Sequence, residues 1–424
     1  MKTKSLNAKN LYFVIGLVLI AFTFALNERI IVGLFPSYKL SFSAELKYAV
    51  FVLDVVFALA LAFMLVRHQP KAKIALDAAV GLGFALLMLA GIELAFFYLN
   101  SRNARQLENV VFEFANGSEQ ADVQFDGEHA QAFFQRDAWL GYRPVANMRA
   151  IASRTDGEQT LYRATYSIDA YGRRVTPLEP PSNRPNFILF FGGSYTFGEG
   201  VNDDETMPFY VSQLAPNYRS YNFGVGGYGP QQMLAMLQRD AVSEGIGESR
   251  GILLYTFISE HLDRAIGTMF IHNQRGELMP YYFVDPKGNL VRHGDLASGR
   301  PALSLFYAIA GKSQTLRYFN INFPPQMRSQ DYRATVKMID EARRLFGEKF
   351  RSDGFVVLIY PGRGVPDLLP YLEAAGIDYL DYSDIPEIYH DNFWLGEGHP
   401  TAGAHKIVAE MLVRDLVLRT DGVR

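Results

Sequence analysis

The sequence predicts an α/β protein in which a parallel sheet has helices on both faces, preceded by three transmembrane helices and a small β-rich lead-in. Long apolar runs are confined to the first hundred residues, a polar, turn-rich stretch follows, and short apolar strands then alternate with helical segments. Such alternation is typical of parallel sheets. We therefore expect a membrane anchor over residues 1–100, a lead-in over 101–185 and an α/β domain over 186–424, with an insertion at about 267–325.

Three apolar runs, at residues 11–33, 47–66 and 74–99, predict the membrane spans. A helix needs roughly 20 apolar residues to cross a hydrocarbon core of about 30 Å. Buried core helices would not account for three such runs so close together. The first run would also fit a cleaved signal peptide, but no convincing small-residue cleavage site follows it.

The positively charged flanks of these runs predict the orientation. Basic residues lie before the first run and between the second and third, at Lys2, Lys4, Lys9, Arg67, Lys71 and Lys73. Because basic flanks stay in the cytoplasm, everything after Asn100 is expected on the periplasmic or extracellular side. Loss of the first run by cleavage would not change this result. The expected location is the cytoplasmic (inner) membrane, with several spans.

Two carboxylates fall inside the apolar runs, Asp54 in the second and Glu93 in the third. Carboxylates within a membrane are often functional. Both residues, however, are predicted near the outer face, where their side chains reach the interface. We therefore leave them out of the candidate site.

The composition excludes several classes of function. The formal net charge is −3 and no cluster of Lys and Arg suggests nucleic acid as a partner. The absence of cysteine excludes disulfides, thiol nucleophiles and cysteine-based zinc sites. The eight histidines are not grouped at ligand spacings, so we expect no metal and no other cofactor.

The α/β region begins after the proline-rich boundary at Pro180–Pro185, which can continue neither a helix nor a strand. The lead-in before it is expected to contain a strand at Ala164–Asp169, a turn and a second short strand. The strands expected after it are Asn186–Phe191, Tyr218–Phe223, Gly251–Phe257, Phe355–Tyr360 and Ile377–Tyr382. The helices expected there are Thr206–Leu214, Pro230–Val242, Tyr332–Phe350 and Thr401–Leu418.

A serine between a strand and a helix is the first candidate reactive group. Residues 191–201 read FGGSYTFGEGV, so Ser194 directly follows the first strand of the α/β region. Small neighbours let a substrate carbonyl approach and leave the backbone N–H of Ser194 facing it. A glycine turn after a strand would by itself be weak evidence for a reactive serine, whereas the eleven residues 191–201 taken together are more specific.

A histidine near the C-terminus supplies the base that such a serine needs. Residues 395–405 read LGEGHPTAGAH and open the final helix. A serine hydroxyl becomes a good nucleophile when an imidazole within hydrogen-bond reach takes its proton. His399 is the candidate, and a carboxylate behind its ring would fix the tautomer. His405 is expected to be a packed or capping residue of the helix.

Together with residues 222–232, NFGVGGYGPQQ, these motifs resemble the first, second and last blocks of the SGNH (GDSL-like) hydrolases. The resemblance covers roughly residues 186–417, without the insertion. It implies the flavodoxin-like SGNH fold, with Ser194 as nucleophile and His399 as base. It also implies an oxyanion-binding N–H at Gly227, with Gly226 as the alternative. The orienting acid falls on Glu397, with Asp391 as the alternative.

The chain departs from the family pattern in two places. Gly193 stands where the family usually has the aspartate of its first block. After Phe257 the family expects Gly-x-Asn-Asp, whose Asn amide is an oxyanion donor, but residues 258–264 read ISEHLDR. An ionised Glu260 cannot donate a hydrogen bond. Ser259 or His261 would have to serve as the donor, and His261 fits a structural role equally well.

The resemblance implies a serine esterase that hydrolyses acyl esters through a Ser-His-acid, acyl-enzyme mechanism. A domain tethered outside the membrane suggests an envelope glycan or lipid as substrate, and envelope-biosynthesis proteins as partners. Transfer of the acyl group to a glycan hydroxyl is an alternative, because the same acyl-enzyme serves both reactions. A catalytically weak domain that binds glycan or acts as a scaffold is a further alternative, motivated by the two departures.

Overall fold

The computed structural model describes residues 88–101, 110–114, 121–123, 133–178, 183–396 and 398–417. The expected spans 11–33 and 47–66, Asp54, and most of the span 74–99 lie outside these residues. Within the described part, no helix has the length and apolar character needed to cross a membrane. The chain forms two compact units, Met1–Ala104 with Ala310–Gln326, and Arg105–Ile309 with Met327–Arg424.

In the first unit, a helix over residues 88–101 packs against the end of the predicted insertion. Its apolar contacts form a small buried cluster of Ile92, Phe96, Phe319 and Ile321. Glu93 accepts hydrogen bonds from the Ser313 hydroxyl (2.7 Å) and from the backbone N–H of Gln314 (2.5 Å). These groups begin helix α12 (Gln314–Tyr318), so Glu93 places a carboxylate at a helix N-terminus, where negative charge is favourable.

The region expected as a lead-in is rich in strands. An antiparallel sheet has the order β2–β1–β5–β6, and a separate hairpin joins β3 to β4. Their bounds are β1 (Val110–Phe114), β2 (Ala121–Val123), β3 (Phe134–Asp137), β4 (Gly141–Pro144), β5 (Arg149–Asp156) and β6 (Gln159–Ser167). The core of this region includes Tyr166 and also Phe197, a residue of the α/β part, so the two regions share buried surface.

The prediction of a parallel sheet is confirmed. Five parallel strands lie in the order β13–β12–β9–β7–β8. Their bounds are β7 (Asn186–Phe191), β8 (Tyr218–Asn222), β9 (Arg250–Phe257), β12 (Gly354–Ile359) and β13 (Tyr379–Asp381). Counted along the chain, this order is 2-1-3-4-5, which reverses direction between β7 and β9. In doubly wound sheets, ligands bind beyond the carboxyl ends of the strands at such a reversal.

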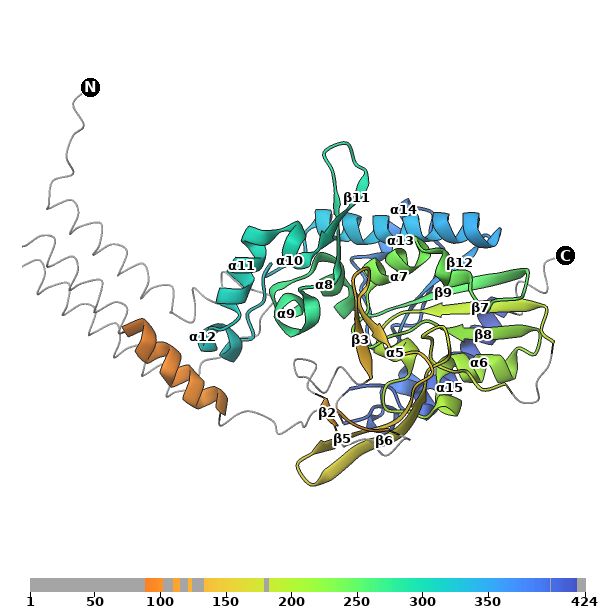
Figure 1. Cartoon of the computed structure of the whole chain (residues 1–424), viewed down its shortest axis with the longest axis horizontal. Helices are drawn as coiled ribbons and strands as arrows, with labels where there is room; N and C mark the ends of the chain where they lie inside the picture. The colour runs from red at the N-terminus through yellow and green to blue at the C-terminus, as the bar shows by residue number, and fades with distance from the viewer. Residues whose placement is uncertain are drawn as a thin grey trace, which may run out of the picture. The chain divides into compact units, whose positions relative to one another are not determined.

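Helices cover both faces of this sheet (Figure 1). One face packs on α7 (Pro230–Leu237), α8 (Glu260–Ile266), α13 (Ser329–Phe350) and α14 (Leu369–Ala374). The other packs on α6 (Met207–Leu214) and α15 (Ala402–Leu412). Strand β7 is buried on both faces, because Leu189 and Phe191 point to the first core and Ile188 and Phe190 to the second.

The stretch expected as an insertion, residues 267–325, has its own secondary structure. It contains α9 (Met269–Ile271), the hairpin β10 (Pro280–Val284) and β11 (Leu290–Asp295), α10 (Leu296–Gly299), α11 (Pro301–Ala310) and α12. The hairpin packs on the face of α7 and α13, since Tyr282 belongs to the core of that face. The hairpin therefore enlarges one layer of the α/β part, whereas residues 310–325 belong to the first unit.

Candidate active site

Ser194 follows strand β7 and begins a short helix. The strand ends at Phe191, two glycines follow, and α5 (Ser194–Phe197) starts at the serine. The Ser194 side chain is buried at 5% exposure. This strand–turn–helix places the hydroxyl at the carboxyl edge of the sheet, beside the reversal of strand order.

His399 reaches Ser194 from the far end of the chain. Its Nε2 lies 2.9 Å from Ser194 Oγ, although 205 positions separate the two residues in the sequence. A bridge between Trp394 and Pro400 closes the loop that carries the histidine. The Tyr195 hydroxyl fixes this loop by donating to the carbonyl of Gly398 (2.8 Å). An imidazole at this distance can take the proton of the serine hydroxyl.

Of the two candidate acids, only Asp391 lies among the residues that the structure describes. Glu397 lies outside the described residues, so its orienting role stays a prediction. Asp391 begins the short 3₁₀ helix η6 (Asp391–Phe393), and its side chain is exposed. Its backbone carbonyl accepts the N–H of Trp394 (3.1 Å).

The turn after β8 carries the glycine expected to bind an oxyanion. Gly227 has φ +83°, in the left-handed region that favours glycine. Among the described residues, neither the Ser194 N–H nor the Gly227 N–H donates to a backbone carbonyl. The preceding carbonyl, of Gly226, accepts a hydrogen bond from the Tyr142 hydroxyl (2.6 Å). Tyr142 of the lead-in thus anchors the turn through the Gly226 carbonyl.

The third block forms the start of α8, where Ser259 is engaged locally and His261 bonds through one of its two ring nitrogens. The Ser259 hydroxyl donates to Glu260 Oε2 (3.0 Å). His261 is 1% exposed, and its Nδ1 lies 2.9 Å from the Tyr255 hydroxyl. Burial, together with the nearby Arg264 cation, holds the pKa of His261 well below its usual value, so the ring is neutral at pH 7. Its Nε2 is buried beside Gly193.

Glu260 is held by Arg363, which also contacts the nucleophile helix. Arg363 Nη1 lies 3.0 Å from Glu260 Oε1, and Nε donates to the Tyr195 hydroxyl (2.9 Å). Nη2 also reaches the carbonyl of Gly398 at 3.5 Å. One guanidinium therefore joins the third block, the nucleophile helix and the histidine loop, and it neutralises the carboxylate that would oppose an oxyanion.

Sequence reasoning missed one residue beside the pair and one that holds its loop. Glu199, within the first motif, has Oε2 only 3.6 Å from His399 Nε2. Arg174 is 2% exposed, and its guanidinium donates to the carbonyls of Phe197 (2.8 Å) and Val201 (2.7 Å) and to Asp203 Oδ1 (3.1 Å). Arg174 therefore shapes the loop that carries Glu199. Glu199 and Arg174 lie in segments that we predicted only as a turn and a short strand. Nothing in their sequence spacing indicated that they would be buried.

His405 lies fully buried in α15. Burial, with smaller contributions from Arg174 and His399, lowers its pKa to about 3, so the ring stays neutral. Its backbone N–H bonds to the carbonyl of Thr401 (3.0 Å). We assign it to the core of the helix.

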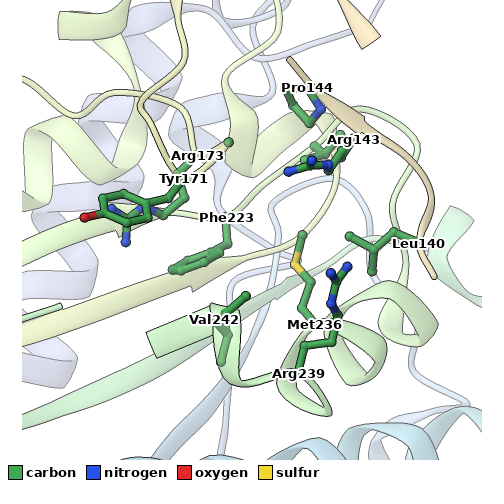
Figure 2. A pocket seen from close by; sticks show the side chains of 12 residues that line it. Leu140, Arg143, Pro144, Tyr171, Arg173, Phe223, Met236, Arg239 and Val242 are labelled. Carbon is green, nitrogen blue, oxygen red and sulfur yellow. The ribbon is translucent and has the colours of Figure 1, made fainter. Parts of the chain in front are cut away.

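A hollow lined by three arginines lies apart from the residues of the candidate site (Figure 2). Arg143 comes from β4 and Arg239 follows α7, and both lie 3.4 Å from Asp137 Oδ2. Arg173 is 6% exposed and pairs with Asp169 (2.8 Å), and its guanidinium lies 4.5 Å from the centre of the Tyr171 ring. Asp137 and Asp169 thus balance most of the positive charge of these arginines. We interpret the hollow as a junction between the lead-in and the sheet.

Comparison with known proteins gives weak similarity in structure alone. No protein-family model and no curated protein sequence matches this chain. A lipolytic protein of the G-D-S-L family from Veillonella parvula is 14% identical over 55% of this chain and 98% of its own, with a TM-score of 0.32. A catalytic mutant of Axe2, an acetylxylan esterase from Geobacillus stearothermophilus, is 11% identical over 55% and 95%, with a TM-score of 0.30.

AlinE4, described as an SGNH-hydrolase family esterase, is 14% identical over 57% of this chain and 100% of its own, with a TM-score of 0.27. Two of these three neighbours are described as G-D-S-L or SGNH family members, and the third as an acetylxylan esterase. At such values the similarity carries no argument about this chain. The proposals below therefore rest on its own geometry.

Proposed function

We propose that this protein is an SGNH-type serine esterase, with Ser194 as nucleophile and His399 as its base. The observation that carries this proposal is the 2.9 Å contact between Ser194 Oγ and His399 Nε2 at the carboxyl edge of the parallel sheet. Two backbone N–H groups, of Ser194 and Gly227, are available for an oxyanion in the adjoining turns. A nucleophile, a base and oxyanion donors together are the requirements for acyl transfer.

The proposed reaction has two halves. Ser194 Oγ attacks the ester carbonyl while His399 Nε2 takes its proton, and the ester C–O bond then breaks as that proton passes to the leaving alcohol. Water next attacks the acyl-serine, again giving its proton to Nε2, and the acid product leaves as Ser194 regains a proton. We assign the orientation of the ring to Glu397. An acceptor hydroxyl in place of water would make the same site an acyltransferase.

The proposed setting is the outer side of the cytoplasmic membrane, with an acyl ester of an envelope glycan or lipid as substrate. The apolar runs at 11–33, 47–66 and 74–99 and their basic flanks support this setting.

Labelling with a serine-reactive fluorophosphonate tests the assignment of the nucleophile. The full-length protein in detergent should be labelled, and peptide mapping should place the label on Ser194. Ser194→Ala should lose both the label and turnover of a short-chain aryl ester. His399→Ala should lose at least roughly 10³-fold in kcat, and the double variant should be hardly slower, because the two residues act as a unit. A label on another serine, or none, would contradict the proposal and favour a binding domain.

A further inference from the structure

A carboxylate lies on the proton-transfer side of the proposed catalytic base. Glu199 Oε2 is 3.6 Å from His399 Nε2, the same nitrogen that contacts Ser194 Oγ at 2.9 Å. The Glu199 side chain is 16% exposed and that of His399 is 17% exposed. Both are thus largely enclosed yet accessible to a bound molecule.

The loop around Glu199 holds this carboxylate in place. The Glu199 N–H bonds to the carbonyl of Ser194 (3.0 Å), and the N–H of the next residue, Gly200, donates to the Tyr166 hydroxyl (2.7 Å). Oε2 also lies 3.4 Å from the point that a Cβ atom on Gly226 would occupy. The carboxylate therefore reaches both the imidazole and the turn that carries the oxyanion glycine.

The chemistry of the proposed reaction indicates what would contact Glu199. His399 Nε2 returns its proton to the leaving alcohol, so the alcohol oxygen must come within hydrogen-bond distance of that nitrogen. A group 3.6 Å from Nε2 therefore faces the alcohol half of the ester. An ionised carboxylate only accepts hydrogen bonds. Without a donor it would oppose the negative charge that develops on the carbonyl oxygen.

We propose that Glu199 selects esters whose alcohol carries a hydroxyl beside the ester oxygen, as O-acylated glycans do, by accepting a hydrogen bond from that hydroxyl. This inference rests on the esterase function proposed above. A neighbouring hydroxyl is the donor that the proposed glycan substrates provide. An ammonium group would satisfy the same carboxylate, and a cationic ester distinguishes the two.

A matched pair of esters tests this selection. The full-length protein in detergent would be assayed with 2-hydroxyethyl acetate and 2-methoxyethyl acetate, in which a methyl group replaces the donor hydrogen. The wild-type protein should favour the hydroxyl ester by roughly 10- to 100-fold in kcat/KM, because a charged acceptor left without its donor is unfavourable. In Glu199→Ala the ratio should fall close to one. Glu199→Gln keeps an acceptor oxygen and should give an intermediate ratio.

The ratio is measured within each variant, so a general loss of activity cancels. Asp204→Asn is the matched control, because Asp204 is an exposed carboxylate of the same loop. Its ratio should equal that of the wild type. A ratio that Glu199→Ala leaves unchanged would overturn the inference while the esterase function stands. Faster turnover of the trimethylammonioethyl ester than of the hydroxyethyl ester would assign Glu199 to cations instead. Absence of turnover with every ester, together with absence of labelling, would instead remove the proposed function itself.

Discussion

Arg264 Nη1 lies 2.7 Å from the point that a Cβ atom on Gly193 would occupy, and His261 Nε2 lies 3.0 Å from the same point. The space that an aspartate side chain would need at this position is thus taken by two residues of the third block. The same guanidinium nitrogen donates to the carbonyl of Tyr228 (2.9 Å), in the turn that carries Gly227. Gly193 of the first motif and Arg264 of residues 258–264 therefore fit one another in space.

Restoring a side chain at Gly193 should destabilise the protein. Gly193→Ala would displace Arg264 from the Tyr228 carbonyl, and overpacking of this kind costs about 1–3 kcal/mol. Gly193→Asp should cost at least as much and should lower esterase activity, although it recreates the family motif. Urea unfolding and aryl-ester turnover measure the two effects.

The matched control for this prediction is a glycine with open space around it. A Cβ atom on Gly376 would meet nothing within 4 Å, but its φ of +61° strains any side chain there. Gly247, which has open space and no such backbone requirement, is the better site. Gly247→Ala should unfold at the wild-type urea concentration. A gain of activity in Gly193→Asp would show that Arg264 and His261 do not exclude a side chain at this position.

The acid behind His399 can be identified by comparing Glu397→Gln with Asp391→Asn. If Glu397 orients the imidazole, its replacement should lower kcat by roughly 10²- to 10⁴-fold, because the neutral amide stabilises the wrong tautomer and no longer supports imidazolium. Asp391→Asn should stay within a few-fold of the wild type, since Asp391 is exposed. The reverse order of effects would move the role to Asp391 and leave the mechanism intact.

Arg363 should act as a positioning residue for the histidine loop. Arg363→Met removes the bonds to Tyr195 and Glu260 together, and we expect kcat to fall by about 10- to 100-fold with a much smaller change in KM. Arg363→Lys should recover part of the loss. Steady-state kinetics on an aryl ester separates kcat from KM, and Arg344→Met, at an exposed arginine of α13, controls for loss of a surface charge.

Glu260→Gln distinguishes positioning from simple charge pairing. The Glu260 side chain is 41% exposed, so its ion pair with Arg363 contributes little stability. This variant should lose less activity than Arg363→Met, because Arg363 keeps its bond to Tyr195. An equal loss in the two variants would show that the ion pair, and not the link to the histidine loop, is what matters.

The membrane topology predicts a clear result from a reporter fused after Arg424. A reporter that is active only in the periplasm should be active there, because basic flanks hold both predicted cytoplasmic segments inside. A reporter active only in the cytoplasm should be silent at the same position. The opposite pattern would remove the argument for an envelope substrate, while the serine and histidine assignments would remain.

The sequence by itself determined the parallel sheet and the edge of it that carries the motifs. Strand β7 was predicted with the bounds Asn186–Phe191 that the structure shows, because a run of apolar residues between glycines and prolines depends on local order alone. The closing helix, predicted as Thr401–Leu418, begins at Ala402 for the same reason. Glycines in turns after strands marked where Ser194 and Gly227 stand.

Only the tertiary structure decided which distant groups meet at that edge. Arg174 and Glu199 carried no periodic signal, because the burial of a charged residue depends on partners that the fold brings together. The reason that Gly193 lacks a side chain lies in Arg264, 71 positions later in the chain. Local sequence patterns determine where strands, turns and helices form. Which side chain fills the space beside Gly193 depends on several elements, and is decided only when those elements pack together.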